Sequence, residues 1–231
     1  MKKKLVLFIL ALFLTFPMTS LANSSKANSQ ANKVGIEKQA ENYFDNLDIK
    51  EKNKQKVLKK IKSGKLLNAD NPDKYTPEVI EELTVDMDEP VKEYTFEDGS
   101  KVRVSAVPGP QRVINCGSGY CAYDYYLIKR EAFNTVAEFR ADFTIVQGDS
   151  EPDYIRHVYD ASVSYYPGYV EDYNLLVNRA TEYVYGGGEE AKATLYFTCI
   201  STGGTASFDA YLRLVVGNDG FSVVPSGNWY N

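Results

Sequence analysis

The sequence has a single histidine among its 231 residues. This excludes metal sites and catalytic centres that need two or more imidazoles, and a histidine-based triad would have to use His157. In the alternating pattern of its segment, His157 shares a face with Ile155, Tyr159 and Val163. We therefore expect a partly buried, hydrogen-bonded histidine rather than a catalytic base.

Beyond Ala22 no apolar run approaches the eighteen residues of a membrane-spanning helix, no cysteine follows to accept a lipid, and no apolar C-terminal tail offers an anchor. Residues 1–22 differ from the rest. Three lysines, a short apolar run and the small-residue end Ser20-Leu21-Ala22 predict a signal peptide that is cleaved after Ala22. The sequence thus predicts a secreted, extracellular protein.

Acidic residues outnumber basic ones, and the formal net charge is −5 at pH 7. Loss of residues 1–22, which carry three lysines and no acid, lowers this to about −8. Such a charge argues against nonspecific binding to nucleic acid or to anionic lipid.

Three cysteines in an exported protein predict one disulfide and one leftover thiol. Cys116 and Cys121 enclose a flexible Gly-Ser-Gly-Tyr loop, and we favour a bridge between them. The alternative is a bridge from Cys199 to one of the two, although Cys199 lies far along the chain in a strand pattern.

The N-terminal part of the mature chain predicts little β-structure. The polar composition of residues 23–34 predicts a disordered leader. Helical spacing of apolar residues predicts a helical hairpin over residues 35–65. Asn, Pro and acidic residues predict an extended linker over residues 66–90. Asp48 followed by Glu51 predicts the capped start of the second helix. That helix is the one basic patch of the sequence, formed by Lys50, Lys52, Lys54, Lys56, Lys59, Lys60 and Lys62.

Residues 91–231 alternate apolar and polar positions, with glycines between the runs. Asp98-Gly99 predicts a type I′ hairpin turn, and the segment 133–145 predicts the clearest strand. The resulting fold class is mainly β, an antiparallel β-sandwich of immunoglobulin-like or related type preceded by a short N-terminal helical hairpin.

Tyrosine is the compositional outlier, with eighteen residues. If Leu195 faces Leu212 across the last hairpin, Tyr196 and Tyr211 form an outward pair. Tyrosine rings suit recognition of sugars or proteins, so this pair is the predicted ligand site. The alternative is that the tyrosines only stabilise the sheet.

Acidic groups give two further hypotheses. Asp149, Glu151 and Asp153 could ligate calcium through their oxygens, or they form an ordinary acidic loop. No other metal or cofactor is expected. Glu138 and Asp142 lie on one face of a predicted strand, about 13 Å apart, which is too far for a glycosidase pair.

Two segments carry a resemblance to known proteins. Residues 90–100, with the lysine-rich helix before them, and residues 141–148, followed by Asp153-Tyr-Ile-Arg-His-Val-Tyr, resemble exported β-rich proteins of low-GC Gram-positive bacteria for which no activity is known. The favoured hypothesis is a secreted, noncatalytic binding module at or near the Gram-positive cell surface, with an envelope glycan or a protein as partner. The alternatives are an extracellular carboxylate-dependent glycan hydrolase or a secreted factor that acts on neighbouring cells.

Overall fold

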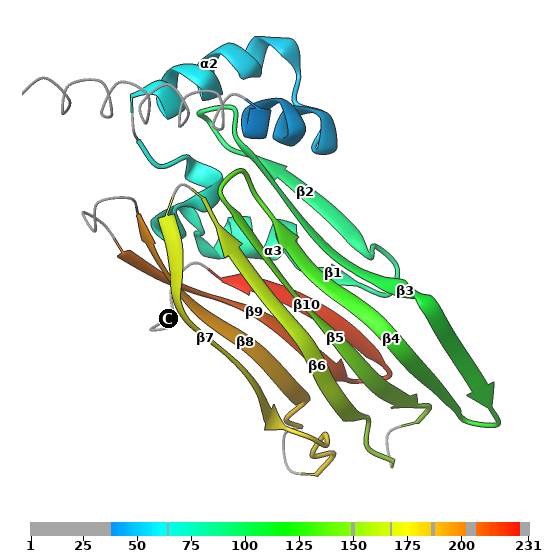
Figure 1. Cartoon of the computed structure of the whole chain (residues 1–231). Helices are drawn as coiled ribbons and strands as arrows, with labels where there is room; N and C mark the ends of the chain where they lie inside the picture. Colours follow the sequence, from blue (N-terminus) through cyan, green and yellow to red (C-terminus); the bar gives the residue numbers. More distant parts are fainter. Residues whose placement is uncertain are drawn as a thin grey trace, which may run out of the picture. The chain divides into compact units, whose positions relative to one another are not determined.

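The computed structural model describes residues 38–63, 65–148, 151–166, 168–185, 188–201 and 207–226 (Figure 1). The predicted signal peptide and leader, and the first residues of the predicted hairpin, lie outside this part and stay predictions. Within the described chain, no helix is long and apolar enough to span a membrane.

In the part of the chain that the structure describes, ten antiparallel strands form two five-stranded sheets. Sheet A has the order β1-β10-β9-β8-β7 and sheet B the order β2-β3-β4-β5-β6. The strands of sheet A are β1 (Val85–Asp86), β10 (Gly220–Ser226), β9 (Ser207–Gly217), β8 (Ala191–Ser201) and β7 (Gly168–Arg179). Those of sheet B are β2 (Val91–Thr95), β3 (Lys101–Gly117), β4 (Tyr120–Glu131), β5 (Thr135–Val146) and β6 (Tyr154–Tyr165).

The predicted β-sandwich is confirmed. Its inner faces hold one large apolar core, to which β5 contributes Phe139 and Phe143 and β8 contributes Leu195 and Phe197, all fully buried. The strands of each sheet follow one another as a meander, with β1 added beside β10. This order differs from the Greek-key connections of immunoglobulin domains.

The predicted register of the last long hairpin is also confirmed. Leu195 pairs with Leu212, and Tyr196 pairs with Tyr211. A slip of one residue would turn every apolar side chain of both strands to the opposite face, so the apolar pattern fixes this register.

The segment 66–90 is not an extended linker. It forms the 3₁₀ turns η1 (Asn68–Asp70) and η2 (Pro72–Lys74), helix α3 (Pro77–Leu83) and strand β1, which pairs with β10. Thr76 caps α3 by accepting a hydrogen bond from the N–H of Val79, and Pro77 occupies the first turn. Pro72 and Pro77 therefore start helical turns.

The residues before β2 form a second, smaller core. Helical residues 38–46 and helix α2 (Glu51–Lys62) bury an apolar set against the β4–β5 loop. The hydroxyl of Tyr43 donates to the carbonyl of Lys101 at 2.5 Å, and its ring contacts Phe133 edge-on. The set comprises Ala40, Tyr43, Phe44, Leu47, Ile49, Val57, Leu67 and Phe133.

Two predicted turn details are wrong. Asp48 does not cap α2; it has φ +46° and lies between the two helical segments, while Lys50 precedes α2 without a side-chain cap. The Asp98-Gly99 turn is not of type I′, which needs positive φ at both residues, because φ is positive only at Gly99 (+84°). Phe96 and Ser100 close a three-residue loop instead, and the carboxylate of Asp98 binds Lys60 at 2.7 Å.

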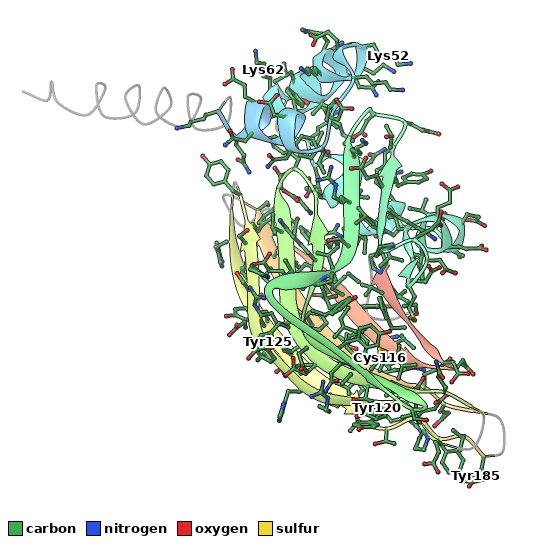
Figure 2. All side chains as sticks on the ribbon, turned by 90° about the vertical axis from the view of Figure 1, so that its right-hand side faces the viewer. Lys52, Lys62, Cys116, Tyr120, Tyr125 and Tyr185 are labelled. Carbon is green, nitrogen blue, oxygen red and sulfur yellow. A yellow bond between two sulfur atoms is a disulfide. The ribbon has the colours of Figure 1, made fainter. Side chains whose placement is uncertain are left out.

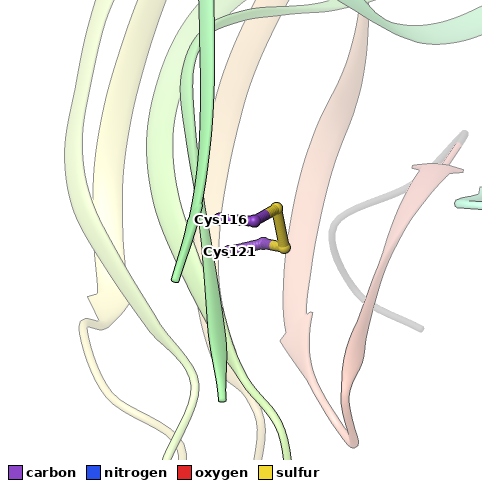
Figure 3. The surroundings of a disulfide bond; sticks show 2 residues. All are labelled: Cys116 and Cys121. Carbon is purple, nitrogen blue, oxygen red and sulfur yellow. A yellow bond between two sulfur atoms is a disulfide. The ribbon is translucent and has the colours of Figure 1, made fainter. Parts of the chain in front are cut away.

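The predicted disulfide joins Cys116 and Cys121 across the β3–β4 hairpin (Figure 3). The two residues face each other directly in the strand register. Cys199 is a free, fully buried thiol on the inner face of β8, in phase with Leu195 and Phe197.

One end of the main core holds a buried ionisable group. The Arg130 side chain of β4 donates to the carbonyl of Ala69 at 3.0 Å and to the hydroxyl of Tyr75 at 2.7 Å. Nearby, the carboxylate of Asp70 accepts hydrogen bonds from Asn134 and Thr135. Burial raises the pKa of Asp70 to about 6, although Arg130 and these hydrogen bonds favour the carboxylate.

We expect Asp70 to make stability decline as pH rises. In the unfolded chain an aspartate releases its proton near pH 3.9, whereas folded Asp70 keeps it to about pH 6. The folded state therefore binds the extra proton between these values, and its advantage is lost as pH rises through 6. The unfolding free energy of wild type minus that of Asp70→Asn should decrease from pH 4 to pH 7 in urea titrations.

Asp73→Asn is the matched control, because it makes the same change at an exposed position of the same segment. A difference between wild type and Asp70→Asn that stays constant over this range would contradict the assignment.

Candidate functional site

The predicted ligand pair, Tyr196 and Tyr211, has the predicted register, but one of its two rings is buried. Tyr196 and Tyr211 contact each other on the outer face of sheet A, with ring centroids 6.2 Å apart. Tyr211 is only 7% exposed, because the guanidinium of Arg213 covers its ring at 4.5 Å. The expectation of two exposed rings is therefore wrong for Tyr211, and the pair offers no open platform.

The outer face of sheet B carries a different constellation, at a series of β-bulges. On β4, two residues, Asp124 and Tyr125, lie opposite the single residue Asp142 of β5. The carboxylate of Asp142 accepts a hydrogen bond from the N–H of Tyr125 at 2.8 Å and so closes this bulge. Bulges of this kind redirect side chains and are frequent beside functional sites.

Tyr125 has φ +59°, in the left-handed region that costs a non-glycine residue roughly 1–2 kcal/mol. Its side chain is 38% exposed. On the other side of the bulge, Gly109 of β3 approaches closely: a Cβ there would lie 2.6 Å from the carbonyl oxygen of Tyr125 and from Nη1 of Arg140. The strained backbone at Tyr125 is thus held from both neighbouring strands, by Asp142 of β5 and by the close approach of Gly109 of β3.

Strand β6 adds two side chains to this face. Tyr159 donates its hydroxyl to Asp142 at 3.0 Å, and its ring meets that of Tyr125 edge-on. Burial, and then the hydrogen bond and charge of Asp142, raise the pKa of Tyr159 to about 12. Nδ1 of His157 lies 3.8 Å from the second oxygen of Asp142.

His157 is exposed rather than partly buried, with 77% of its side chain accessible. The alternating pattern fails because β6 is itself bulged: Asp142 pairs with His157, but the next residue, Phe143, pairs with Ile155. The extra residue, Arg156, shifts the phase, so that Ile155 lies in the core and His157 faces solvent.

We call Tyr125, Arg140, Asp142, His157 and Tyr159 the bulge cluster. It combines an exposed aromatic ring with a carboxylate, an imidazole and a guanidinium, and Nε of Arg140 lies 3.5 Å from Asp160. These groups can stack on the apolar face of a ring and hydrogen-bond hydroxyls at its rim. Figure 2 shows Tyr125 away from the hairpin tip that holds Cys116 and Tyr120.

Helix α2 presents a second candidate surface. Lys52, Lys56 and Lys59 recur at helical spacing, are exposed, and form no ion pair within the described residues. We call them the lysine stripe. Beside it is a hollow of about 440 Å³ lined by Gln55, Leu58, Lys59, Lys62 and Ser63. Lys60, in contrast, is bound to Asp98 and Asn68.

The predicted calcium loop is described in part, since Asp149 lies outside the described residues. Glu151 is exposed and Asp153 is buried. Asp153 accepts a hydrogen bond from the N–H of Val146 at 2.6 Å, and burial, with Glu182 nearby, raises its pKa to about 6. In the described part of the chain, no three acidic, histidine or cysteine side chains are placed to hold a metal ion.

Comparisons with known proteins add little. No family model and no curated protein matches the sequence. Among solved structures, a hypothetical protein from Listeria monocytogenes EGD-e aligns with a TM-score of 0.35 and 15% identity, over 62% of this chain and 94% of that one. At this level the likeness does not bear on function.

The alternating pattern put Asp142 on the same strand face as Glu138, but it did not predict the bulge cluster. The available signal was the run Tyr123-Asp124-Tyr125-Tyr126, in which two adjacent aromatic residues break the alternation of a regular strand. Such a break marks a bulge, but it does not identify which residues of the neighbouring strands lie beside it.

The burial of Tyr211 leads to a stability prediction. Replacing Tyr211 by Ala should lower the free energy of unfolding by about 3 kcal/mol, because a buried ring is lost. Tyr196→Ala should cost about 1 kcal/mol, the loss of a cross-strand contact. Urea denaturation of the two single variants tests this; equal costs would show that the two rings are buried alike.

Proposed function

We propose that this chain is an exported, noncatalytic binding module that acts at or near the surface of a Gram-positive cell, and that its bulge cluster binds an envelope glycan. The observation that carries the proposal is Tyr125, an exposed ring held in a strained backbone conformation beside Asp142. Residues in sparsely populated backbone regions persist where the surrounding structure holds them, and they gather at ligand sites.

The groups around Tyr125 favour a sugar over an apolar ligand. The second oxygen of Asp142 can accept from a hydroxyl, and exposed His157 can donate or accept. The Tyr125 ring can lie against the C–H face of a pyranose. Because the cluster lies on the outer face of a sheet, several units of a polymer could follow the strands.

The lysine stripe independently supports action at the surface of a Gram-positive cell. Gram-positive envelopes are anionic, and three exposed lysines on one helix are an electrostatic footprint in a chain of net charge −5. Attachment through the stripe should weaken with salt, whereas stacking on Tyr125 should not. The two modes can therefore be separated in one assay.

A carboxylate-dependent glycan hydrolase stays the alternative. Asp142 is near the proposed ligand, but its first oxygen is committed to Tyr125 and Tyr159. Release of labelled fragments from peptidoglycan during incubation with the mature protein would favour hydrolysis. Binding without release favours the module.

The glycan site is tested by changing Tyr125 alone. Tyr125→Ala and Tyr125→Gly should both weaken binding to purified cell walls at least tenfold in pull-down titrations, because the stacking ring is lost. Neither should lower the unfolding free energy by more than about 1 kcal/mol, since glycine relieves the positive φ at the cost of one edge-on ring contact.

The matched control is Tyr120→Ala, which removes a ring of similar exposure, 41% against 38%, from the β3–β4 hairpin. It should bind as wild type does. If Tyr125→Gly is folded and binds walls with unchanged affinity, the bulge cluster is not the glycan site.

The stripe is tested by replacing Lys52, Lys56 and Lys59 with Gln. This triple variant should lose the salt-sensitive part of wall binding, and wild type should lose the same part on walls stripped of teichoic acid. The control replaces three exposed lysines outside the stripe, Lys38, Lys65 and Lys74, and removes the same charge. Equal losses in both triple variants would show that net charge matters and the stripe does not.

A further inference from the structure

Strand β7 is the end strand of sheet A, and it exposes more apolar surface than its position in a sandwich requires. Four of its large apolar side chains are exposed: Tyr169 (56%), Tyr173 (47%), Leu176 (42%) and Val177 (42%). Apolar side chains exposed together on one strand mark a surface for association.

Two of these side chains point inward. Tyr173 pairs with Phe197 and Val177 pairs with Ala193, and both partners on β8 are fully buried. Tyr173 and Val177 share the inner face with them but are almost half exposed. The inner face of the sandwich is therefore incompletely covered beside Tyr173 and Val177.

The two lateral edges of the sandwich differ. On one side, α3 contacts β2 and β10 and so covers the margin between the sheets (Figure 1). On the other side, β6 lies close to β7 at both ends: the Tyr165 ring lies against Gly168, and Ile155 donates to the carbonyl of Ala180, just beyond β7. Within the described residues, no ladder joins β6 to β7 between Gly168 and Arg179.

The charges of β7 are segregated along the strand. Its two bulges fall near its ends: Glu171 is the extra residue of one, next to Asp172, and Asn178 is the extra residue of the other, next to Arg179. Asp172 and Arg179 pair with the outward residues Thr198 and Lys192. The acidic end of the strand and its basic end are thus separated by an uncharged, mostly apolar centre.

We propose that β7 pairs antiparallel with β7 of a second copy of this chain, about a twofold axis at Leu175. In this register Glu171 faces Arg179 of the other copy, Tyr173 faces Val177, and Leu175 faces itself. Asp172 faces Asn178, so the extra residue of each bulge lies one position away from the extra residue of the facing bulge. Each pairing occurs twice, as a twofold interface requires.

The favoured occupant is a second copy because β7 is complementary to itself. Antiparallel pairing of any strand with itself brings its first half against its second half, and here that places acid against base and an aromatic ring against a β-branched side chain. Like charges meet nowhere in this register. A heterologous strand would need the same order of charges to fit as well.

Sedimentation velocity of the mature protein over a range of concentrations tests the proposal. Wild type should form a reversible dimer. Glu171→Lys combined with Asp172→Lys should raise the dissociation constant at least tenfold, because the lysine at position 171 would face Arg179 of the other copy and the acidic end of the strand would become basic. Adding Arg179→Glu and Glu189→Gln should restore dimerisation, the second change removing the acid that pairs with Arg179 within one copy.

The matched control is Glu81→Lys combined with Glu82→Lys, an adjacent exposed acidic pair on α3. It should dimerise as wild type does, and all variants should melt cooperatively by circular dichroism. A wild type that stays monomeric at every concentration overturns the proposal, as does equal weakening by the control pair.

A cysteine scan tests the register. Leu175→Cys should form an intermolecular disulfide under mild oxidation, because residue 175 faces its own symmetry mate. Tyr173→Cys should not, since four residues of strand, about 13 Å, would separate the two thiols. Equal cross-linking of both variants, or of neither, contradicts the twofold axis at Leu175.

Discussion

The burial of the Arg130 guanidinium is the constraint that organises one end of this sandwich. A charge taken out of water needs partners, and among the described residues its hydrogen-bond partners come from outside sheet B. The carbonyl of Ala69 and the hydroxyl of Tyr75 accept from it, and Asp70 adds a nearby carboxylate. Nε and Nη1 have no partner within the described residues, so the desolvation is only partly offset. The segment that carries these acceptors must therefore fold over the sheet.

This requirement explains why the segment 66–90 could not be predicted from its composition. Prolines and acids are typical of linkers, and they are equally typical of helix starts. What orders the segment is Arg130, sixty residues further along the chain and itself placed on an apolar strand face. The face of the sheet to which each side chain points could be predicted where apolar and polar residues alternate regularly, as in the pairing of Leu195 with Leu212. The prediction failed at His157, because the extra residue Arg156 leaves no mark in the pattern.

β-Bulges shift the side-chain alternation of β6, and a bulge in β4 also creates the candidate site. A regular strand would turn Tyr123 and Tyr125 to the same face; the bulge keeps Tyr123 and Tyr126 in the core and presents Tyr125 outward at a positive φ. Asp142 holds that conformation by accepting from the Tyr125 N–H. By contrast, the predicted pair Tyr196 and Tyr211 lies on regular strands, where neighbouring side chains such as Arg213 cover a ring. An irregular backbone therefore distinguishes the exposed Tyr125 from the predicted pair.

Pairing through β7 would also change what a weak glycan site can do. One stacked ring with a few hydrogen bonds supplies modest affinity, because the fixed cost of association consumes much of the contact energy. A dimer carries two bulge clusters and two lysine stripes on one particle, and the envelope offers repeating ligands. Once one cluster is bound, the second meets its ligand at a high effective concentration, so that avidity can exceed the affinity of either site by orders of magnitude. The β7 edge and the bulge cluster would then act together. Each copy would make weak, exchangeable contacts with the glycan, while the dimer would stay bound to the envelope.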